Sequence, residues 1–339
     1  MKHALSDVDV LHASPRIVTP ASAHPVLDAG TQQFLDMVAE AGLSPDTLLF
    51  QPRASCNATP RDGVSAKRGD VVGEDLVLPT GSTGAIHVRI MRPRKASASL
   101  PAVLYFPGGG WRMTDRTLHE ALARRLALEA GVAIVCVENA RAATLRYPAR
   151  NEEAYSALMH IVTHATSLSI DSRRIAIAGD GMGANIAAAL TLMVRSRRGP
   201  ALAFQLLFYP IVSANETTDS FRQFAEGPGM SAHAMRAAIL DQFAIETLSD
   251  ALAMPLNATQ ADLEGLPPAL IVTAENDVMR DAAEAYARNL MRAGVEVTAS
   301  RYLGTVHDFV VLAGLAETPP ARAAIAQACS ALQSALRDR

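Results

Sequence analysis

The chain has 339 residues, of which 49% are hydrophobic and 19% charged, and its formal net charge at pH 7 is −3. A balance this close to neutral offers no electrostatic field for nucleic acid or an acidic membrane, so we expect a small molecule as the partner. Three scattered cysteines, Cys56, Cys136 and Cys329, show neither a disulfide framework nor metal-ligand spacing, which fits a reducing cytoplasm. No apolar run suits a signal peptide or a bilayer span, so we expect a cytoplasmic protein without membrane contact.

The chain begins with a stretch that we interpret as an N-terminal cap segment, residues 1–75. It mixes short helical patterns, such as residues 32–41, with Pro and Ser breaks, and it ends in a polar stretch at residues 54–70. From about Val71 the apolar residues alternate, at residues 74–78 and 85–90, as in half-buried strands. We therefore place an α/β domain at residues 71–339.

Five nearly apolar runs follow and alternate with amphipathic stretches. The runs at residues 102–106, 133–137, 175–178, 204–208 and 269–273 lack alternation, which indicates strands buried on both faces. Helical patterns lie between or after them at residues 118–129, 152–163, 184–195 and 282–293. This rhythm predicts an α/β fold with a mostly parallel, doubly wound sheet flanked by helices. A helical stretch at residues 232–243 interrupts it, so residues 213–249 are expected to form a lid insertion over the ligand crevice.

A glycine loop comes directly after the run that ends at Phe106. Gly108, Gly109 and Gly110 leave bare backbone N–H groups that can approach a ligand oxygen, as in an oxyanion hole. A triple glycine on its own is equally typical of a flexible turn, so its neighbours decide the interpretation. Trp111, the only tryptophan, is a candidate pocket residue, and core filler is the alternative.

Residues 179–183 read Gly-Asp-Gly-Met-Gly between a strand pattern and a helix pattern. A sharp strand-to-helix turn of this kind is typical of a nucleophile elbow, whose centre normally carries a serine. Here the centre is Gly181, which has no side chain, and a plain glycine turn is the alternative. Asp180 is a candidate pocket residue, and the amide of Met182 is a candidate oxyanion donor.

An acid and a histidine complete the order elbow, acid, histidine that α/β-hydrolases use. Asp277 follows the run at residues 269–273, and His307 precedes the last helix pattern. Either residue alone is commonly a helix cap or a surface side chain, but their joint order favours a site. Phe309 is a candidate pocket residue. We expect no metal site, because His160 and His164 share a helical face without a third ligand.

Together these motifs resemble the hormone-sensitive-lipase-like branch of the α/β-hydrolases, which are mostly bacterial carboxylesterases and acetyl esterases. The resemblance covers roughly residues 70–335. The family's His-Gly-Gly-Gly loop is matched by Pro-Gly-Gly-Gly-Trp at residues 107–111, and its Gly-Asp-Ser-Ala-Gly elbow by residues 179–183. Its acid and histidine segments are matched at residues 277–281 and 307–309. The resemblance implies that no cofactor is needed and that a homodimer is common.

Three departures from the family pattern shape the functional prediction. Gly181 replaces the serine, Pro107 replaces the loop histidine, and residues 139–144 depart from the family's Tyr-Arg-Leu-Ala-Pro-Glu. Without a hydroxyl at the elbow, acyl-enzyme catalysis is lost. We therefore expect serine-independent chemistry of the dehydratase, lyase or cyclase type on a carbonyl- or ester-bearing small molecule. His307 would act as the base, and the backbone amides of Gly108, Gly109 and Met182 would form the oxyanion hole.

Three alternatives stay open. The first is a weak or vestigial ester hydrolase, in which His307 activates a water in the space that the serine would fill. The second is an engineered nucleophile-null esterase, although a substitution made to trap a substrate would not also alter Pro107 and residues 139–144. The third is a non-catalytic ligand-binding protein, the role that gibberellin receptors have within the resembled family.

Overall fold

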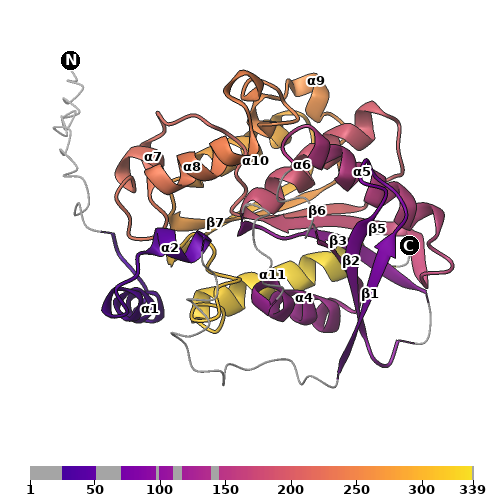
Figure 1. Ribbon diagram of the computed structural model, residues 1–339, viewed down its shortest axis with the longest axis horizontal. Helices are drawn as coiled ribbons and strands as arrows, with labels where there is room; N and C mark the ends of the chain where they lie inside the picture. The colour runs from indigo at the N-terminus through magenta and orange to yellow at the C-terminus, as the bar shows by residue number, and fades with distance from the viewer. Residues whose placement is uncertain (1–24, 51–69, 97–98, 110–116, 139–144, 338–339) are drawn as a thin grey trace, which may run out of the picture.

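A single mixed sheet forms the centre of the computed structural model, which describes residues 25–50, 70–96, 99–109, 117–138 and 145–337 (Figure 1). The sheet has eight strands in the order β1-β2-β4-β3-β5-β6-β7-β8. Antiparallel pairing joins β1 to β2 and β2 to β4, and every other neighbouring pair is parallel. The expected α/β fold class, with a mostly parallel sheet flanked by helices, is confirmed.

Seven of the eight strands coincide with the apolar or alternating runs of the sequence. The strands span Val71–Leu78 (β1), Ile86–Pro93 (β2), Leu100–Phe106 (β3), Ala133–Glu138 (β4), Ile170–Asp180 (β5), Phe204–Phe208 (β6), Ala269–Asn276 (β7) and Val297–Val306 (β8). The sequence analysis did not predict β8. This strand lies at the edge of the sheet and is largely exposed until its last three residues, so it needs no apolar run to form.

The longer helices match the helical stretches of the sequence, with ends that differ by a few residues, whereas the short helices α2, α7 and α9 were not predicted. They span Ala29–Glu40 (α1), Pro45–Phe50 (α2), Thr117–Ala130 (α4), Ala149–Thr163 (α5), Gly181–Ser196 (α6), Asp219–Gln223 (α7), Ala232–Gln242 (α8), Gln260–Leu263 (α9), Arg280–Arg292 (α10) and Pro319–Ala335 (α11). Two short 3-10 helices, Ile245–Thr247 (η3) and Pro255–Asn257 (η4), lie between α8 and α9. None of these described helices has both the length and the apolar character that crossing a bilayer requires.

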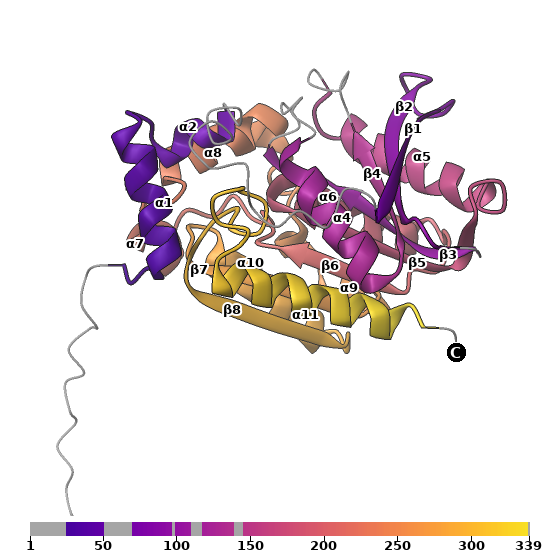
Figure 2. The same ribbon diagram turned by 90° about the horizontal axis from the view of Figure 1, so that it is seen from below.

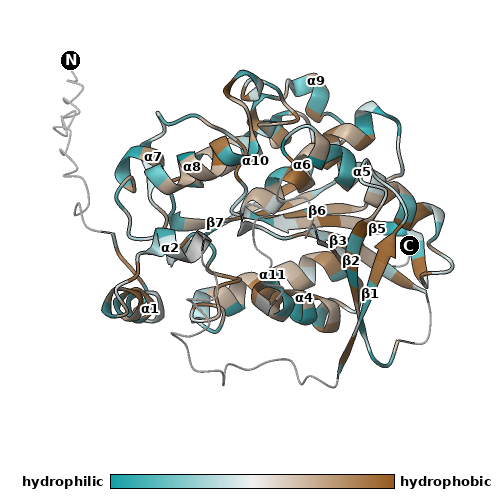
Figure 3. Cartoon of the chain, viewed as in Figure 1, coloured by the Kyte–Doolittle hydropathy of each residue, from teal (hydrophilic) through white to brown (hydrophobic). Residues whose placement is uncertain are grey.

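Two apolar cores hold the sheet between helical layers. Side chains alternate along β3, so that Leu104 packs with α5 and α6 on one face while Val103 packs with α4 and α11 on the other. Figure 3 shows apolar residues concentrated on the strands, with the polar residues on the outer sides of the helices. Because both faces are covered, the central strands have no polar side to alternate with, which explains their continuous apolar runs.

The N-terminal helices and the inserted helices lie together at one end of the molecule (Figures 1 and 2). In α1, Phe34 and Val38 are fully buried in the core that also contains α4 and α11. At the start of α8, both the amide and the hydroxyl of Ser231 donate to the carboxylate of Asp46 in α2, at 2.8 and 2.7 Å. Residues 25–50 and the insertion are therefore joined directly to each other.

Candidate active site

A buried acid–histidine pair lies at the carboxyl ends of β7 and β8. His307 Nδ1 is 2.6 Å from Asp277 Oδ2, and the side chains of both residues are almost completely buried. The second carboxylate oxygen, Asp277 Oδ1, accepts the amide hydrogen of Met279 at 2.8 Å. With both oxygens engaged, Asp277 holds the imidazole in one orientation, and His307 Nε2 is left to face the hollow described below.

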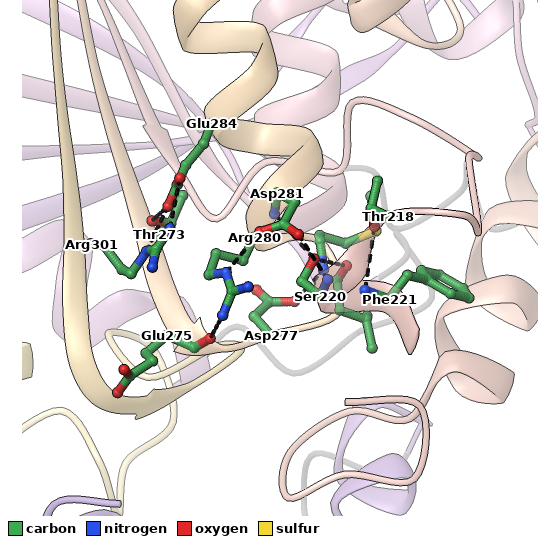
Figure 4. A network of polar contacts seen from close by, with 12 residues as sticks. Thr218, Ser220, Phe221, Thr273, Glu275, Asp277, Arg280, Asp281, Glu284 and Arg301 are labelled. Atoms are coloured by element: carbon green, nitrogen blue, oxygen red, sulfur yellow. Dashed lines mark hydrogen bonds and ion pairs between the residues drawn. The ribbon is translucent and has the colours of Figure 1, made fainter. Parts of the chain in front are cut away.

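Contacts with the insertion fix the loop that carries Asp277 (Figure 4). The Ser220 amide in α7 donates to Asp281 Oδ2 at 2.7 Å, and the Ser220 hydroxyl donates to the carbonyl oxygen of Val278 at 3.0 Å. Arg280 donates both to Asp281 and to the carbonyl oxygen of Glu275. Burial alone would raise the pKa of Asp281, but the hydrogen bonds from Arg280 and Ser220 lower it, so Asp281 stays ionised and anchors the loop.

The turn at Gly181 has the conformation of a nucleophile elbow. β5 ends at Asp180, α6 begins at Gly181, and Gly181 has φ of +50°. A Cβ atom placed on this residue would lie 3.3 Å from His307 Nε2 and 3.9 Å from Asp308 Oδ1. The structure thus brings the three predicted positions Gly181, Asp277 and His307 together, with a glycine where a side chain would meet the imidazole.

Asp180 fastens the glycine loop, and this corrects one predicted role. The Gly108 amide donates to Asp180 Oδ1 at 3.0 Å, so this N–H already has a partner and is not free for a ligand oxygen. Gly109 lines the hollow, and the amide of Met182 lies in the first turn of α6, where N–H groups have no partner within the helix. Gly109 and Met182 therefore remain the candidate oxyanion donors among the described residues.

The carboxylate of Asp180 is a fully buried hub. It accepts a hydrogen bond of 2.5 Å from the Tyr105 hydroxyl and lies 3.1 Å from His119 Nε2. Burial would raise the pKa of Asp180, but the charge of His119 and the hydrogen bonds from His119, Tyr105 and Gly108 lower it. Asp180 borders the hollow as predicted, but its oxygens are occupied, so it positions the loop that precedes Gly109.

The hollow beside His307 Nε2 has apolar walls and a polar floor. The space within it that a water-sized sphere can occupy is about 30 Å³, so it is a narrow cleft. Its walls come from α1, α2, α4, the insertion and the segment after β8: Phe34, Leu35, Pro45, Leu118, Met230, Val306, Val311 and Leu312. Its polar residues are Gly109, His119, Asp180, His307 and Asp308. Apolar walls with a few convergent polar groups are a combination typical of small-molecule sites.

The two remaining predicted pocket residues are Phe309 and Trp111. Phe309 is fully buried, with its ring 5.9 Å from that of Tyr209 and 5.8 Å from that of Tyr302, measured between centroids. It belongs to the apolar core that contains α4 and α11 and is not among the residues that line the hollow. Trp111, Gly110 and residues 139–144 lie outside the described residues.

The charges around His307 alter the role that the sequence suggested for it. Burial alone would lower the pKa of His307, but the charges of Asp277 and Asp308 and the hydrogen bond to Asp277 raise it to about 9. Because this pKa lies above 7, the protonated imidazolium is the favoured form of His307 at neutral pH. A base role for His307 would need the neutral imidazole, whereas the favoured form at neutral pH can donate a proton.

Asp308 is the site residue that sequence reasoning missed. Its Oδ1 atom lies 3.7 Å from His307 Nε2, and the side chain is 16% exposed. Burial raises the pKa of this carboxyl to about 6, an effect that the His307 charge opposes and that of Asp180 reinforces. The sequence held one signal, an acidic residue directly after His307, but only the turn after β8 shows that it faces the same space.

Comparison with known proteins shows which family has this architecture. A family model of the alpha/beta hydrolase fold matches residues 103–311. The chain is 36% identical over 253 residues to carboxylesterase NlhH of Mycobacterium tuberculosis, and the matched region covers 74% of this chain and 79% of NlhH. It is 33% identical over 304 residues to esterase LipI of the same organism, covering 89% of this chain and 93% of LipI. A crystal structure of a thermostable esterase from Pseudomonas putida superposes with a TM-score of 0.86 at 32% identity, covering 94% of this chain and all of that one.

Proposed function

The chain belongs to the α/β-hydrolase fold family and is carboxylesterase-like, and from this premise we propose that it catalyses a serine-independent reaction on a carbonyl- or ester-bearing small molecule. His307, held by Asp277, transfers the proton, and the amides of Gly109 and Met182 bind the oxyanion that develops on the substrate. The first candidate reaction is elimination or cyclisation, which begins with removal of a proton next to the carbonyl.

One observation carries this proposal: the elbow places a glycine where a side chain would meet His307. A Cβ on Gly181 would lie 3.3 Å from Nε2, so the serine position is open space next to an oriented imidazole. No described side chain supplies a hydroxyl there. A substrate atom can instead approach Nε2 directly, which suits proton transfer to or from the substrate itself.

Ester hydrolysis through a bound water is the second candidate, and the comparisons favour it. The relatives named above are esterases, and the space at Gly181 borders both His307 Nε2 and Asp308 Oδ1, two groups able to bind a water. In triad enzymes that lack a triad member, the oxyanion hole and substrate binding still leave a rate roughly 10³ to 10⁴ above that in water. Hydrolysis by this route is therefore slow compared with a complete triad.

Two probes distinguish the candidates. Dehydration of 4-hydroxybutan-2-one to but-3-en-2-one reports proton removal next to a carbonyl, and release of p-nitrophenol from p-nitrophenyl acetate reports hydrolysis. We expect turnover of at least one probe by the wild-type protein and a loss of about 100-fold or more in His307→Ala, because one proton-transfer group typically contributes that much. His164→Ala, which removes an exposed histidine at the end of α5, is the matched control and should leave turnover unchanged.

The outcomes separate the classes of function. Unaltered turnover in His307→Ala would reject both catalytic candidates. Absence of turnover of either probe by the wild-type protein would reject the proposed function and favour a ligand-binding protein. Gly181→Ser restores a hydroxyl within reach of Nε2, and we expect it to raise hydrolysis of p-nitrophenyl acetate at least about tenfold if the rest of the esterase site is intact.

A further inference from the structure

The turn after β8 presents two titratable side chains in succession to the same hollow. Asp308 has φ of +64°, a left-handed conformation that only a few per cent of residues other than glycine adopt. This conformation places Asp308 Oδ1 3.7 Å from His307 Nε2 and 3.9 Å from the Cβ position of Gly181. A substrate atom or a water in the serine position would therefore contact both groups.

We propose that Asp308 is a catalytic residue, whose carboxylate accepts the proton that the reaction removes while the His307 imidazolium donates a proton to the leaving group. This inference rests on the proposed function and deepens it, because it assigns the base and the acid of the same site to different residues.

Hydrogen bonding supports a free carboxylate at this position. The other two carboxylates near His307 have both oxygens engaged. The oxygens of Asp277 contact the Met279 amide and His307. The oxygens of Asp180 contact Tyr105, the Gly108 amide and His119. Within the described ranges, the carboxylate of Asp308 receives no hydrogen bond. It is the carboxylate that remains able to take up a proton from a ligand.

The charges in the site agree with Asp308 as the base and His307 as the acid. Four titratable groups are close enough to Asp308 to affect its pKa: His307 beside it, Asp180 at the end of β5, His119 in α4 and Asp277 after β7. The hydroxyl of Tyr209, which follows β6, is close enough to feel its charge. Burial raises the pKa of the Asp308 carboxyl to about 6, whereas burial opposes and the charges of Asp277 and Asp308 cause the rise of the His307 pKa to about 9.

Between these values the prevalent form combines an Asp308 carboxylate with a His307 imidazolium. The reverse assignment needs a neutral imidazole beside a protonated carboxyl, which is the less populated form of the pair because the pKa of His307 lies above that of Asp308. Asp308 as base and His307 as acid therefore use the form that is present at neutral pH.

Both candidate reactions balance with this assignment. In elimination, Asp308 takes the proton from the carbon next to the carbonyl, the electron pair of that C–H bond forms the C=C double bond as the C–O bond to the β-hydroxyl breaks, and His307 protonates the departing oxygen to give water. In hydrolysis, Asp308 takes a proton from the attacking water, the new C–O bond forms, and His307 protonates the leaving alkoxide. In each case the proton on Asp308 returns to His307, directly or through solvent, and restores the starting state.

The test compares pH profiles of kcat between pH 5 and pH 10 on both probes. Asp308→Asn and Asp308→Gly remove the carboxylate, and both residues tolerate a positive φ, so the turn is preserved. The wild-type profile is expected to be bell-shaped, rising near pH 6 and falling near pH 9. Both variants should lose about 100-fold or more in kcat at pH 7 and lose the rise near pH 6.

A spectroscopic measurement and two further variants complete the design. Asp308 raises the pKa of His307, so NMR titration of the His307 ring should show a lower pKa in Asp308→Asn than in the wild-type protein. His307→Gln should remove the fall near pH 9. Asp262→Asn, in the exposed capping box of α9, is the control and should leave the profile unaltered.

The results distinguish this inference from the proposed function. If the wild-type protein turns over a probe and Asp308→Asn retains the rise near pH 6, the assignment of Asp308 is overturned while the proposed function stands. A lower kcat with an unmoved profile would likewise make Asp308 a structural residue. If the wild-type protein turns over neither probe, the proposed function fails and this inference fails with it.

Discussion

Single residues without side chains decide how the site of this protein is built. Gly181 opens the space beside His307, and Gly183, two residues later, lets α6 approach the end of β3. A Cβ on Gly183 would lie 1.9 Å from the carbonyl oxygen of Phe106, and its other near neighbours are backbone atoms too. The glycine loop and the elbow are thus held together by backbone packing that no larger residue permits.

We predict that Gly183→Ala is severely destabilising. The backbone atoms it would meet cannot rotate away, so β3 and α6 must separate, at a cost of about 3 kcal/mol or more. Gly265→Ala is the comparison, because a Cβ there meets nothing within 4 Å and only the positive φ of +74° opposes it, at about 1 to 2 kcal/mol. Urea unfolding measures both; equal destabilisation would contradict the packing argument.

At the scale of elements, the site is an assembly of strand ends. β3, β5, β7 and β8 run parallel, so their carboxyl ends meet at one edge and bring Gly109, Gly181, Asp277 and His307 together; these four residues each follow the end of a strand. The helices of residues 25–50 and of the insertion lie over that edge and supply Phe34 and Met230 to the hollow. Their interpretation as a cap and a lid stays a proposal.

The contact between α2 and α8 gives this proposal a test. Asp46→Ala removes two hydrogen bonds from Ser231, and we expect faster amide hydrogen exchange in α1 and α2 with little change in the overall melting temperature. A double-mutant cycle with Ser231→Ala should give a coupling energy of about 1 kcal/mol. Asp36→Ala is the control, since Asp36 bonds only to Gln32 on the exposed face of α1. Unchanged exchange in Asp46→Ala would show that this contact does not hold the helices.

The molecule as a whole is a three-layer structure with one end built up by the N-terminal helices and the insertion (Figure 2). The core below the sheet extends into α1 through Phe34 and Val38, so the N-terminal helices are part of both the core and the hollow. The expected homodimer and cytoplasmic location concern this scale and stay predictions.

Deletion of residues 1–50 should therefore affect stability and substrate binding together. The eight strands lie outside the deleted part, so we expect a sheet signal in circular dichroism to persist. The free energy of unfolding should fall, because burial of a side chain such as Phe34 contributes about 1.5 to 3 kcal/mol. KM for p-nitrophenyl acetate should rise as one wall of the hollow is lost. Phe34→Ala in the full chain should reproduce part of both effects, and an unaltered KM in the deletion variant would remove these helices from the binding site.

Much of the fold could be predicted from the sequence because its signals are local. Continuous apolar runs and helical periodicity arise from burial of each segment, so seven strands and the long helices were identifiable one at a time. The edge strand β8 carries no such signal. Gly181, Asp277 and His307 were identifiable because strand ends and chain order determine which loops meet.

The sequence alone thus determined the fold class, the glycine at the elbow and the acid–histidine pair. Only the tertiary structure decided which groups are free to react: the amide of Gly108 is engaged by Asp180, Phe309 belongs to the core, and Asp308 faces His307. Hydrogen bonding, burial and pKa depend on residues far apart in the chain, and no local pattern records them. For this reason the position of the site could be read from the sequence, whereas the assignment of its acid and its base required the arrangement of the carboxylates around His307.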